Sequence, residues 1–284
     1  MINMVKQYSG NRGFISTAIG ADYLRMAYLQ ALSIKTTQRS ESNYAVIVDK
    51  ETADLIEPKH KDVFDVIVTL NGDWNFAREW ETRNLSPWKR TIKLDADILF
   101  VNDISHWWNS FENHKILFTT DVENYKGAVI TDRWHRKLFD LNHLPNIYTA
   151  FYYFRDGVES AEFFKLCAEI SREWNWFANE FLIKNDNPNP RDDEIFAIAA
   201  QIYGVEQCTL PGAAYPRFVH FKEPLNSLPP DKPWHEQLHI EYNDQLWIGH
   251  HPQRLPIHYI NESFADDKII NQYEQNYRKL NQCA

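Results

Sequence analysis

Short apolar runs alternate with segments of helical periodicity over the first two thirds of the chain. Residues 14–19 and 44–48 are predicted strands, and 23–32 between them carries apolar residues at helical spacing. Strands that alternate with helices imply a mainly parallel sheet, because a parallel pair needs a crossover connection. The same pattern predicts strands at 63–70, 91–94, 98–101, 115–119 and 147–154, and helices at 161–176 and 194–203.

The last third of the chain has a different pattern. Residues 211–235 are rich in proline and are predicted to be irregular. Strands at 247–248 and 257–260 then precede a polar terminal helix, about 263–280. The simplest organisation is a single α/β domain, 1–284, whose C-terminal part folds over the site.

The net charge of the chain argues against one class of function, the binding of nucleic acid. The 284 residues carry a formal net charge of −9, which argues against a protein that holds nucleic acid by neutralising phosphates, without excluding one. Basic stretches at 88–93 and 133–137 are interpreted as solvated surface.

The three cysteines, Cys167, Cys208 and Cys283, are far apart and form no CxxC pair. Such spacing is typical of reduced thiols and predicts neither a disulfide framework nor a zinc site. The sequence shows no signal peptide and no apolar run of about twenty residues. We therefore expect a cytoplasmic protein without a membrane span.

The chemistry centres on Asp95-Ala96-Asp97, directly after the strand 91–94. Ligand sites in open α/β sheets lie at the carboxyl ends of strands. A local turn could bring both acids to one ion, and their hard oxygen atoms suit Mg²⁺ or Mn²⁺ bridging to phosphate. The alternative is an acidic turn without a ligand.

The segment 86–99, which contains Leu94-Asp95-Ala96-Asp97, resembles the metal-binding segment of GT-A glycosyltransferases, particularly the glycogenin and bacterial lipopolysaccharide galactosyltransferase group. The resemblance covers roughly residues 14–204. It implies a GT-A (Rossmann-like) fold with a C-terminal extension, a nucleotide-sugar part at about 10–130 and an acceptor side at about 131–284. By the same resemblance, the following residues are expected to contact the nucleotide sugar: Thr17, Ala18, Tyr23, Asp49, Lys93 and Asp95.

The resemblance also implies roles for acids and a hydroxyl further along the chain. The segment 146–155 lacks the family's Asn-x-Gly, so Thr149, or alternatively Tyr148, is the candidate that replaces its sugar contact. Asp193 or Glu194, at the start of a helix, would face the donor sugar or activate the acceptor hydroxyl. The helix dipole alone could also explain acids in this first turn.

The family's third metal ligand is a late histidine, and two candidates compete. His258 lies on a late predicted strand and is favoured as the ligand, with His220 as the alternate. Lys222, two residues after His220, is expected to contact the diphosphate. An isolated histidine beside an apolar strand is otherwise a packed residue.

These features predict a glycosyltransferase that uses Mn²⁺ or Mg²⁺ and a nucleotide diphosphate-sugar, with UDP favoured. The expected acceptor is a saccharide, and a hydroxylated base in DNA is an alternative. A nucleotidyltransferase would carry a Gly- and Lys-rich phosphate loop, of which 16–20 is a poor example. A non-catalytic carbohydrate-binding protein is the other rival. The sequence predicts neither stereochemistry nor oligomeric state.

Overall fold

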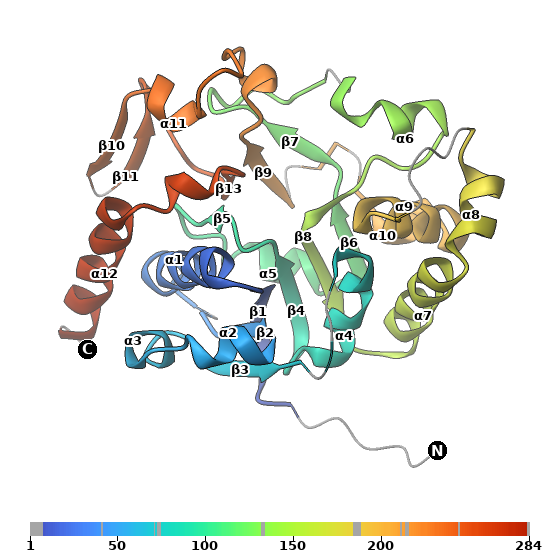
Figure 1. The fold of residues 1–284 in the computed structure, drawn as a ribbon, viewed down its shortest axis with the longest axis horizontal. Helices are drawn as coiled ribbons and strands as arrows, with labels where there is room; N and C mark the ends of the chain where they lie inside the picture. The colour runs from blue at the N-terminus through green and yellow to red at the C-terminus, as the bar shows by residue number, and fades with distance from the viewer. Residues whose placement is uncertain are drawn as a thin grey trace.

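A six-stranded mixed sheet forms the centre of the computed structural model (Figure 1). The structure describes residues 8–40, 42–70, 72, 75–131, 134–183, 189–210, 212–213, 216–243 and 245–282. In the order β3-β2-β1-β4-β8-β6, the first four strands are parallel and β8 is antiparallel to β4 and β6. This confirms the predicted α/β fold with a mostly parallel sheet. The strands are β1 (Gly10–Thr17), β2 (Tyr44–Val48), β3 (Val66–Thr69), β4 (Trp88–Leu94), β6 (Ile116–Thr119) and β8 (Tyr148–Arg155).

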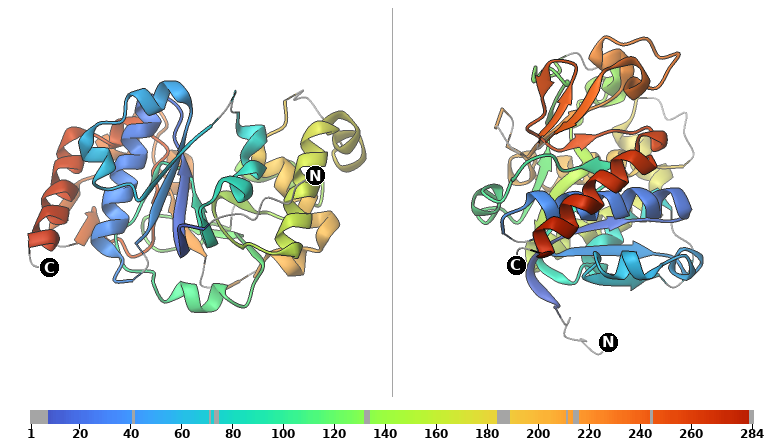
Figure 2. Two further views of the ribbon diagram at one scale, coloured as in Figure 1. Left: turned by 90° about the horizontal axis from the view of Figure 1, so that it is seen from below. Right: turned by 90° about the vertical axis from the view of Figure 1, so that its left-hand side faces the viewer.

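Helices cover both faces of this sheet (Figure 2). On one side α1 (Ala21–Thr37) packs against the sheet, and α12 (Asp267–Gln282) packs on the outer side of α1. On the other side lie α7 (Val158–Arg172), α8 (Trp174–Phe181) and α9 (Asp192–Tyr203). The short helices are α2 (Lys50–Asp54), α3 (Pro58–Lys61), α4 (Thr82–Leu85), α5 (Trp107–Phe111), α6 (Lys137–Leu141), α10 (Val205–Cys208) and α11 (Trp234–Gln237).

Two apolar layers therefore enclose the sheet. Phe14 of β1 contacts the rings of Phe100 and Trp108 on the α1 side. On the other side, Phe118 and Tyr152 contact Phe196 of α9. Many of the aromatic residues of the sequence thus fill the core, although Tyr23, Trp134 and Trp176 are exposed.

Two smaller sheets extend the molecule beyond the carboxyl ends of the parallel strands. One has the order β5-β13-β9-β7 and the other β10-β11-β12. Their strands are β5 (Ile98–Leu99), β7 (Asp121–Glu123), β9 (Arg217–His220), β10 (Ile240–Asn243), β11 (Gln245–Ile248), β12 (His251–Pro252) and β13 (Ile257–His258).

The irregular chain predicted for 211–235 is wrong at β9, which lies between β13 and β7. β9 has only four residues and directly follows Pro216, so its strand character comes from tertiary pairing. The single helix predicted at 161–176 is two helices, because the chain bends at Glu173 (φ −103°, ψ 33°).

Cys167 and Cys208 are buried free thiols, and Cys283 lies outside the described residues. In the described part of the chain, every helix is too short or too polar to cross a lipid bilayer.

Candidate functional site

A cavity of about 780 Å³ lies at the carboxyl ends of β1 and β4, where the sheet meets the smaller sheet of β9 and β13. Ligand sites of open α/β sheets are found at this edge. Its lining includes Thr17, Tyr23, Glu79, Lys93, Asp95, Asp97, Arg136, Tyr148, Thr149, Arg191, Asp192, Asp193, His220, Lys222 and His258.

A tight turn places both carboxylates of the Asp95-Ala96-Asp97 segment at the cavity. The N–H of Ile98 donates to the carbonyl oxygen of Asp95 (3.3 Å), which closes the turn, and the Asp95 N–H donates to Ala150 of β8 (2.9 Å). From α1, Gln30 Nε2 donates to the carbonyl oxygen atoms of Asp95 (2.7 Å) and Ile98 (2.9 Å).

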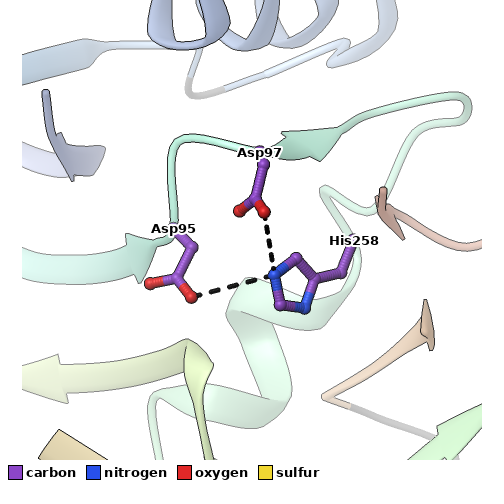
Figure 3. Close-up of side chains that lie close together, drawn as sticks. All are labelled: Asp95, Asp97 and His258. Carbon is purple, nitrogen blue, oxygen red and sulfur yellow. Dashed lines mark ion pairs between the residues drawn. The ribbon is translucent and has the colours of Figure 1, made fainter. Parts of the chain in front are cut away.

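His258 meets the two carboxylates although it lies 161 residues after Asp97 in the chain. It reaches them because β13 pairs with β5, where His258 is the register partner of Ile98. Its Nε2 lies 3.2 Å from Asp97 Oδ2 and 3.9 Å from Asp95 Oδ2 (Figure 3). Ligand atoms of the three residues lie within 4.8 Å of one another. Two carboxylate oxygens and an imidazole nitrogen fit a divalent cation such as Mn²⁺.

Asp97 and His258 each shift the pKa of the other. Burial alone would raise the pKa of Asp97, but His258 and then Lys93 outweigh it and hold that pKa below its ordinary value. Burial alone would lower the pKa of His258, but Asp97 and then Asp95 outweigh it and hold the pKa above its ordinary value. A proton on His258 therefore partly balances the two carboxylates, in the place that a metal ion would take.

His220, the alternate ligand of the sequence analysis, lies behind His258. Its Nδ1 is 3.2 Å from Nδ1 of His258, and its side chain is buried. Burial, followed by the proximity of His258, lowers the pKa of His220 well below its ordinary value, so His220 stays neutral. His220 is thus placed to fix the tautomer of His258 and leave Nε2 facing the carboxylates.

A buried ammonium group lies on the other side of Asp95. Lys93 Nζ is 2.7 Å from Asp95 Oδ1 and 2.6 Å from Glu79 Oε1. Burial alone would lower the pKa of Lys93, but Asp95 and Glu79 hold it well above its ordinary value. Lys93 reaches the cavity wall, but its ammonium group faces these two acids.

The start of α9 brings three acids to different positions. Asp193 accepts hydrogen bonds from Arg136, from the N–H of Thr149 (3.0 Å) and from Thr149 Oγ1 (2.7 Å). Burial would raise the pKa of Asp193, but Arg136 and Thr149 more than offset it and lower the pKa. Glu194 is buried and accepts from the N–H of Arg191 (3.2 Å), which caps the helix.

Asp192, unlike Asp193, has a raised pKa. Its Oδ2 lies 2.7 Å from Thr149 Oγ1 at the cavity wall, so Asp192 and Asp193 compete for the single hydrogen of that hydroxyl. Burial, then the charges of Asp193 and Asp95, raise the pKa of Asp192 to about 7. Asp192 is therefore the acid of this run that exchanges a proton near neutral pH.

The residues predicted at the nucleoside divide into two groups. Thr17 and Tyr23 line the cavity, and the buried hydroxyl of Thr17 has no hydrogen-bond partner among the described residues. Ala18 is fully buried in the core, and Asp49 caps α2 by accepting from the N–H of Thr52 (2.8 Å).

Lys222, predicted at the diphosphate, does line the cavity. Within the described ranges it forms no ion pair. Burial, followed by the charge of Arg136, lowers its pKa. Its ammonium group is thus available to an anionic ligand.

Arg136 and Glu79 are cavity residues that the sequence analysis missed. The interpretation of 88–93 and 133–137 as solvated surface is wrong at Lys93 and at Arg136, which are both buried. The Arg136 guanidinium lies over the rings of Phe139 (3.7 Å) and Tyr148 (4.5 Å) and pairs with Asp193. The only sequence signal was the mixture of aromatic and basic residues around it. No pattern marked Glu79.

No protein-family model matches the chain, and no curated protein matches it. Among solved structures, it is similar to mouse xyloside xylosyltransferase 1 in its apo form (TM-score 0.47, 10% identity, 71% of this chain and 84% of that chain). It is also similar to the galactosyltransferase LgtC in complex with donor and acceptor sugar analogs (0.46, 10%, 69% and 72%). A third is the apo form of the glycosyltransferase GlyE of Streptococcus pneumoniae TIGR4 (0.47, 9%, 94% and 60%). At these identities the likeness concerns the fold alone.

Proposed function

We propose that this protein is a metal-dependent glycosyltransferase that moves a sugar from a nucleotide diphosphate-sugar to a hydroxyl group of an acceptor. The observation that carries the proposal is the convergence of Asp95, Asp97 and His258 at the wall of a cavity large enough for such a donor. The resemblance of the segment 86–99 to the metal-binding segment of GT-A enzymes supports it independently.

We assign different parts of the donor to different residues of the cavity. When bound by Asp95, Asp97 and His258, a divalent cation supplies positive charge to the diphosphate as the glycosidic bond breaks. Lys222 adds a second positive charge there, because its ammonium group has no carboxylate partner in the described chain. Thr17 and Tyr23 lie on the β1 side of the cavity and are the candidates for nucleoside contacts, with UDP as the proposed nucleotide.

The start of α9 is the proposed sugar side of the cavity. Asp193, held by Arg136 and Thr149, keeps its charge and fixes the orientation of Thr149. We assign the proton-exchanging role to Asp192 in place of Asp193 or Glu194, because its pKa of about 7 suits acid–base work at neutral pH. The proposed acceptor is a saccharide hydroxyl.

Thermal unfolding of the purified protein tests the donor. Nucleotides and nucleotide sugars are each added with Mn²⁺ or with EDTA, since a ligand that binds only the folded state raises the unfolding temperature. We expect a metal-dependent rise with one nucleotide diphosphate family. No rise with any ligand in a folded, metal-loaded sample would favour a non-catalytic binding protein.

Substitution of Asp97 tests the catalytic role. Asp97→Ala is expected to abolish donor-dependent transfer while the protein remains folded. Asp54→Ala, an exposed acid on α2, is the matched control and should retain full activity. Full activity of Asp97→Ala would contradict the proposed mechanism.

A further inference from the structure

The central strand β4 carries a lysine where a buried apolar side chain is usual. Lys93 is 2% exposed and lies two residues before Asp95. Glu79, which is 3% exposed, approaches it from the 3-10 helix Phe76–Glu81. The Lys93 ammonium group thus lies between Glu79 Oε1 (2.6 Å) and Asp95 Oδ1 (2.7 Å).

Burial of an ammonium group requires a counter-charge, because an unpaired buried charge is strongly destabilising. Asp95 alone would supply one carboxylate for Lys93. Glu79 supplies another, so the positive charge of Lys93 is shared between two acids. Asp95 keeps Oδ2 on the His258 side, 3.9 Å from Nε2.

We infer that Glu79 is a positioning residue that raises the metal affinity of the Asp95–Asp97–His258 site. It does so by pairing with the Lys93 ammonium group, which then neutralises less of the charge of Asp95. The inference rests on the metal site of the proposed function. A lysine bound to a metal ligand weakens the attraction of that ligand for a cation. Glu79 limits this effect, because it neutralises the ammonium group from the opposite side.

Removal of the Glu79 charge should therefore weaken metal binding. In Glu79→Gln, Lys93 would have Asp95 as its one remaining anionic partner among the described contacts, so Asp95 would offer less negative charge to the ion. Groups that orient metal ligands typically change affinity by 10- to 100-fold. We expect the Kd for Mn²⁺ to rise by about 10-fold or more in Glu79→Gln.

The double variant Glu79→Gln/Lys93→Met should change the affinity in the opposite direction. It removes both buried charges together and frees Asp95 from the ammonium group. We expect it to bind Mn²⁺ more tightly than the wild type. A purely structural role for the Glu79–Lys93 pair predicts weaker binding in both variants, so tighter binding by the double variant distinguishes the two explanations.

The experiment is a titration with Mn²⁺ alone, in which electron paramagnetic resonance measures the free ion without nucleotide or turnover. Glu81→Gln is the matched control: it lies on the same 3-10 helix and pairs with Arg78 (2.6 Å), away from Asp95. Its Kd should equal that of the wild type. Thermal unfolding establishes that each variant is folded, and the double variant alone decides the question if Glu79→Gln is not.

The outcomes separate the two proposals. If the wild type binds no Mn²⁺, the proposed metal site is wrong and this inference falls with it. If the wild type binds Mn²⁺ and the double variant binds it no more tightly than the wild type, the inference is overturned and the metal site remains.

Discussion

His258 is the residue at which proton and metal compete. Its Nε2 faces Asp97 and Asp95, which hold its pKa above the ordinary value of 6.5. A metal ion binds only the unprotonated nitrogen. Mn²⁺ affinity should therefore increase as pH rises through the raised pKa of His258, by up to about tenfold per pH unit below that pKa.

A titration of Mn²⁺ at several pH values checks this prediction. His258→Gln should bind Mn²⁺ more weakly and with a much smaller dependence on pH. His250→Gln is the control, because His250 is an exposed histidine and should change neither property. An unchanged pH dependence in His258→Gln would show that another group controls metal binding.

Individual site residues were predictable only where a local motif marked them. Asp95 and Asp97 follow a strand and form a recognisable motif. The preference for His258 over His220 rested only on its place on a late predicted strand. The sequence does not show that the two lie side by side, nor that the pairing of β13 with β5 brings His258 to the carboxylates. Glu79 carries no motif, since its role depends on a lysine fourteen positions later in the sequence.

At the scale of elements, α1 holds the carboxylate turn through one buried side chain. Gln30 donates to the carbonyl oxygens of Asp95 and Ile98 and accepts from Tyr44 (2.8 Å) and Ser16. Gln30→Leu would leave these buried groups unpaired, at a cost of about 1–3 kcal/mol for each one that finds no new partner. We expect a loss of unfolding free energy in urea of at least about 2 kcal/mol.

The loss should be specific to this position. Gln201→Leu replaces an exposed glutamine of α9 and should change the unfolding free energy by less than about 0.5 kcal/mol. Because Gln30 positions the turn, its variant should also bind Mn²⁺ more weakly. A Gln30→Leu protein as stable as the control would mean that the turn does not depend on α1.

Asp192, in the first turn of α9, should make a contribution to the free energy of unfolding that decreases as pH rises. The pKa of Asp192 is about 7 in the folded state, against about 3.9 for an unperturbed aspartate. The folded state thus binds the proton more tightly, and the contribution of Asp192 to stability is lost as pH rises from about 4 through 7. Asp192→Asn cannot ionise, so its unfolding free energy relative to the wild type should increase over this window.

Urea unfolding of both proteins between pH 4 and 8 tests this expectation. Asp231→Asn, an exposed position, should keep a constant difference from the wild type throughout. A constant difference for Asp192→Asn as well would mean that Asp192 titrates normally and would remove the reason to assign it proton exchange.

The whole molecule shows which parts of a fold a pattern can predict. The alternation of apolar runs and helical periodicity predicted the parallel strands, because β1, β2 and β4 are buried over much of their length and read as apolar runs, and the half-buried edge strand β3 is also apolar. The direction of β8 was not predictable, since a buried antiparallel strand such as 148–155 reads in the same way. The smaller sheets were predicted only in part: 98–101, 247–248 and 257–260 were expected strands, but β9 was not, because a strand of four residues carries little pattern.

Substitutions in the terminal helix α12 test the prediction that the chain is a single domain. Ile269, Ile270 and Tyr273 of α12 are buried in the same core as α1, and Tyr273 donates to the carbonyl oxygen of Phe100 (3.2 Å). If the chain is one cooperative unit, loss of this contact should lower the stability of the whole molecule. Tyr273→Ala should cost about 3–5 kcal/mol, and Tyr273→Phe, which loses only the hydrogen bond, about 1 kcal/mol.

Urea unfolding followed by both tryptophan fluorescence and circular dichroism provides the measurement. Tryptophans occur on both sides of the sheet, at Trp108 and Trp174, so fluorescence reports on both halves. For a single domain the two signals should coincide in each variant and shift together. Two separate transitions, of which Tyr273→Ala moves only one, would instead divide the chain into two units, with the carboxylates and His258 held together by their interface.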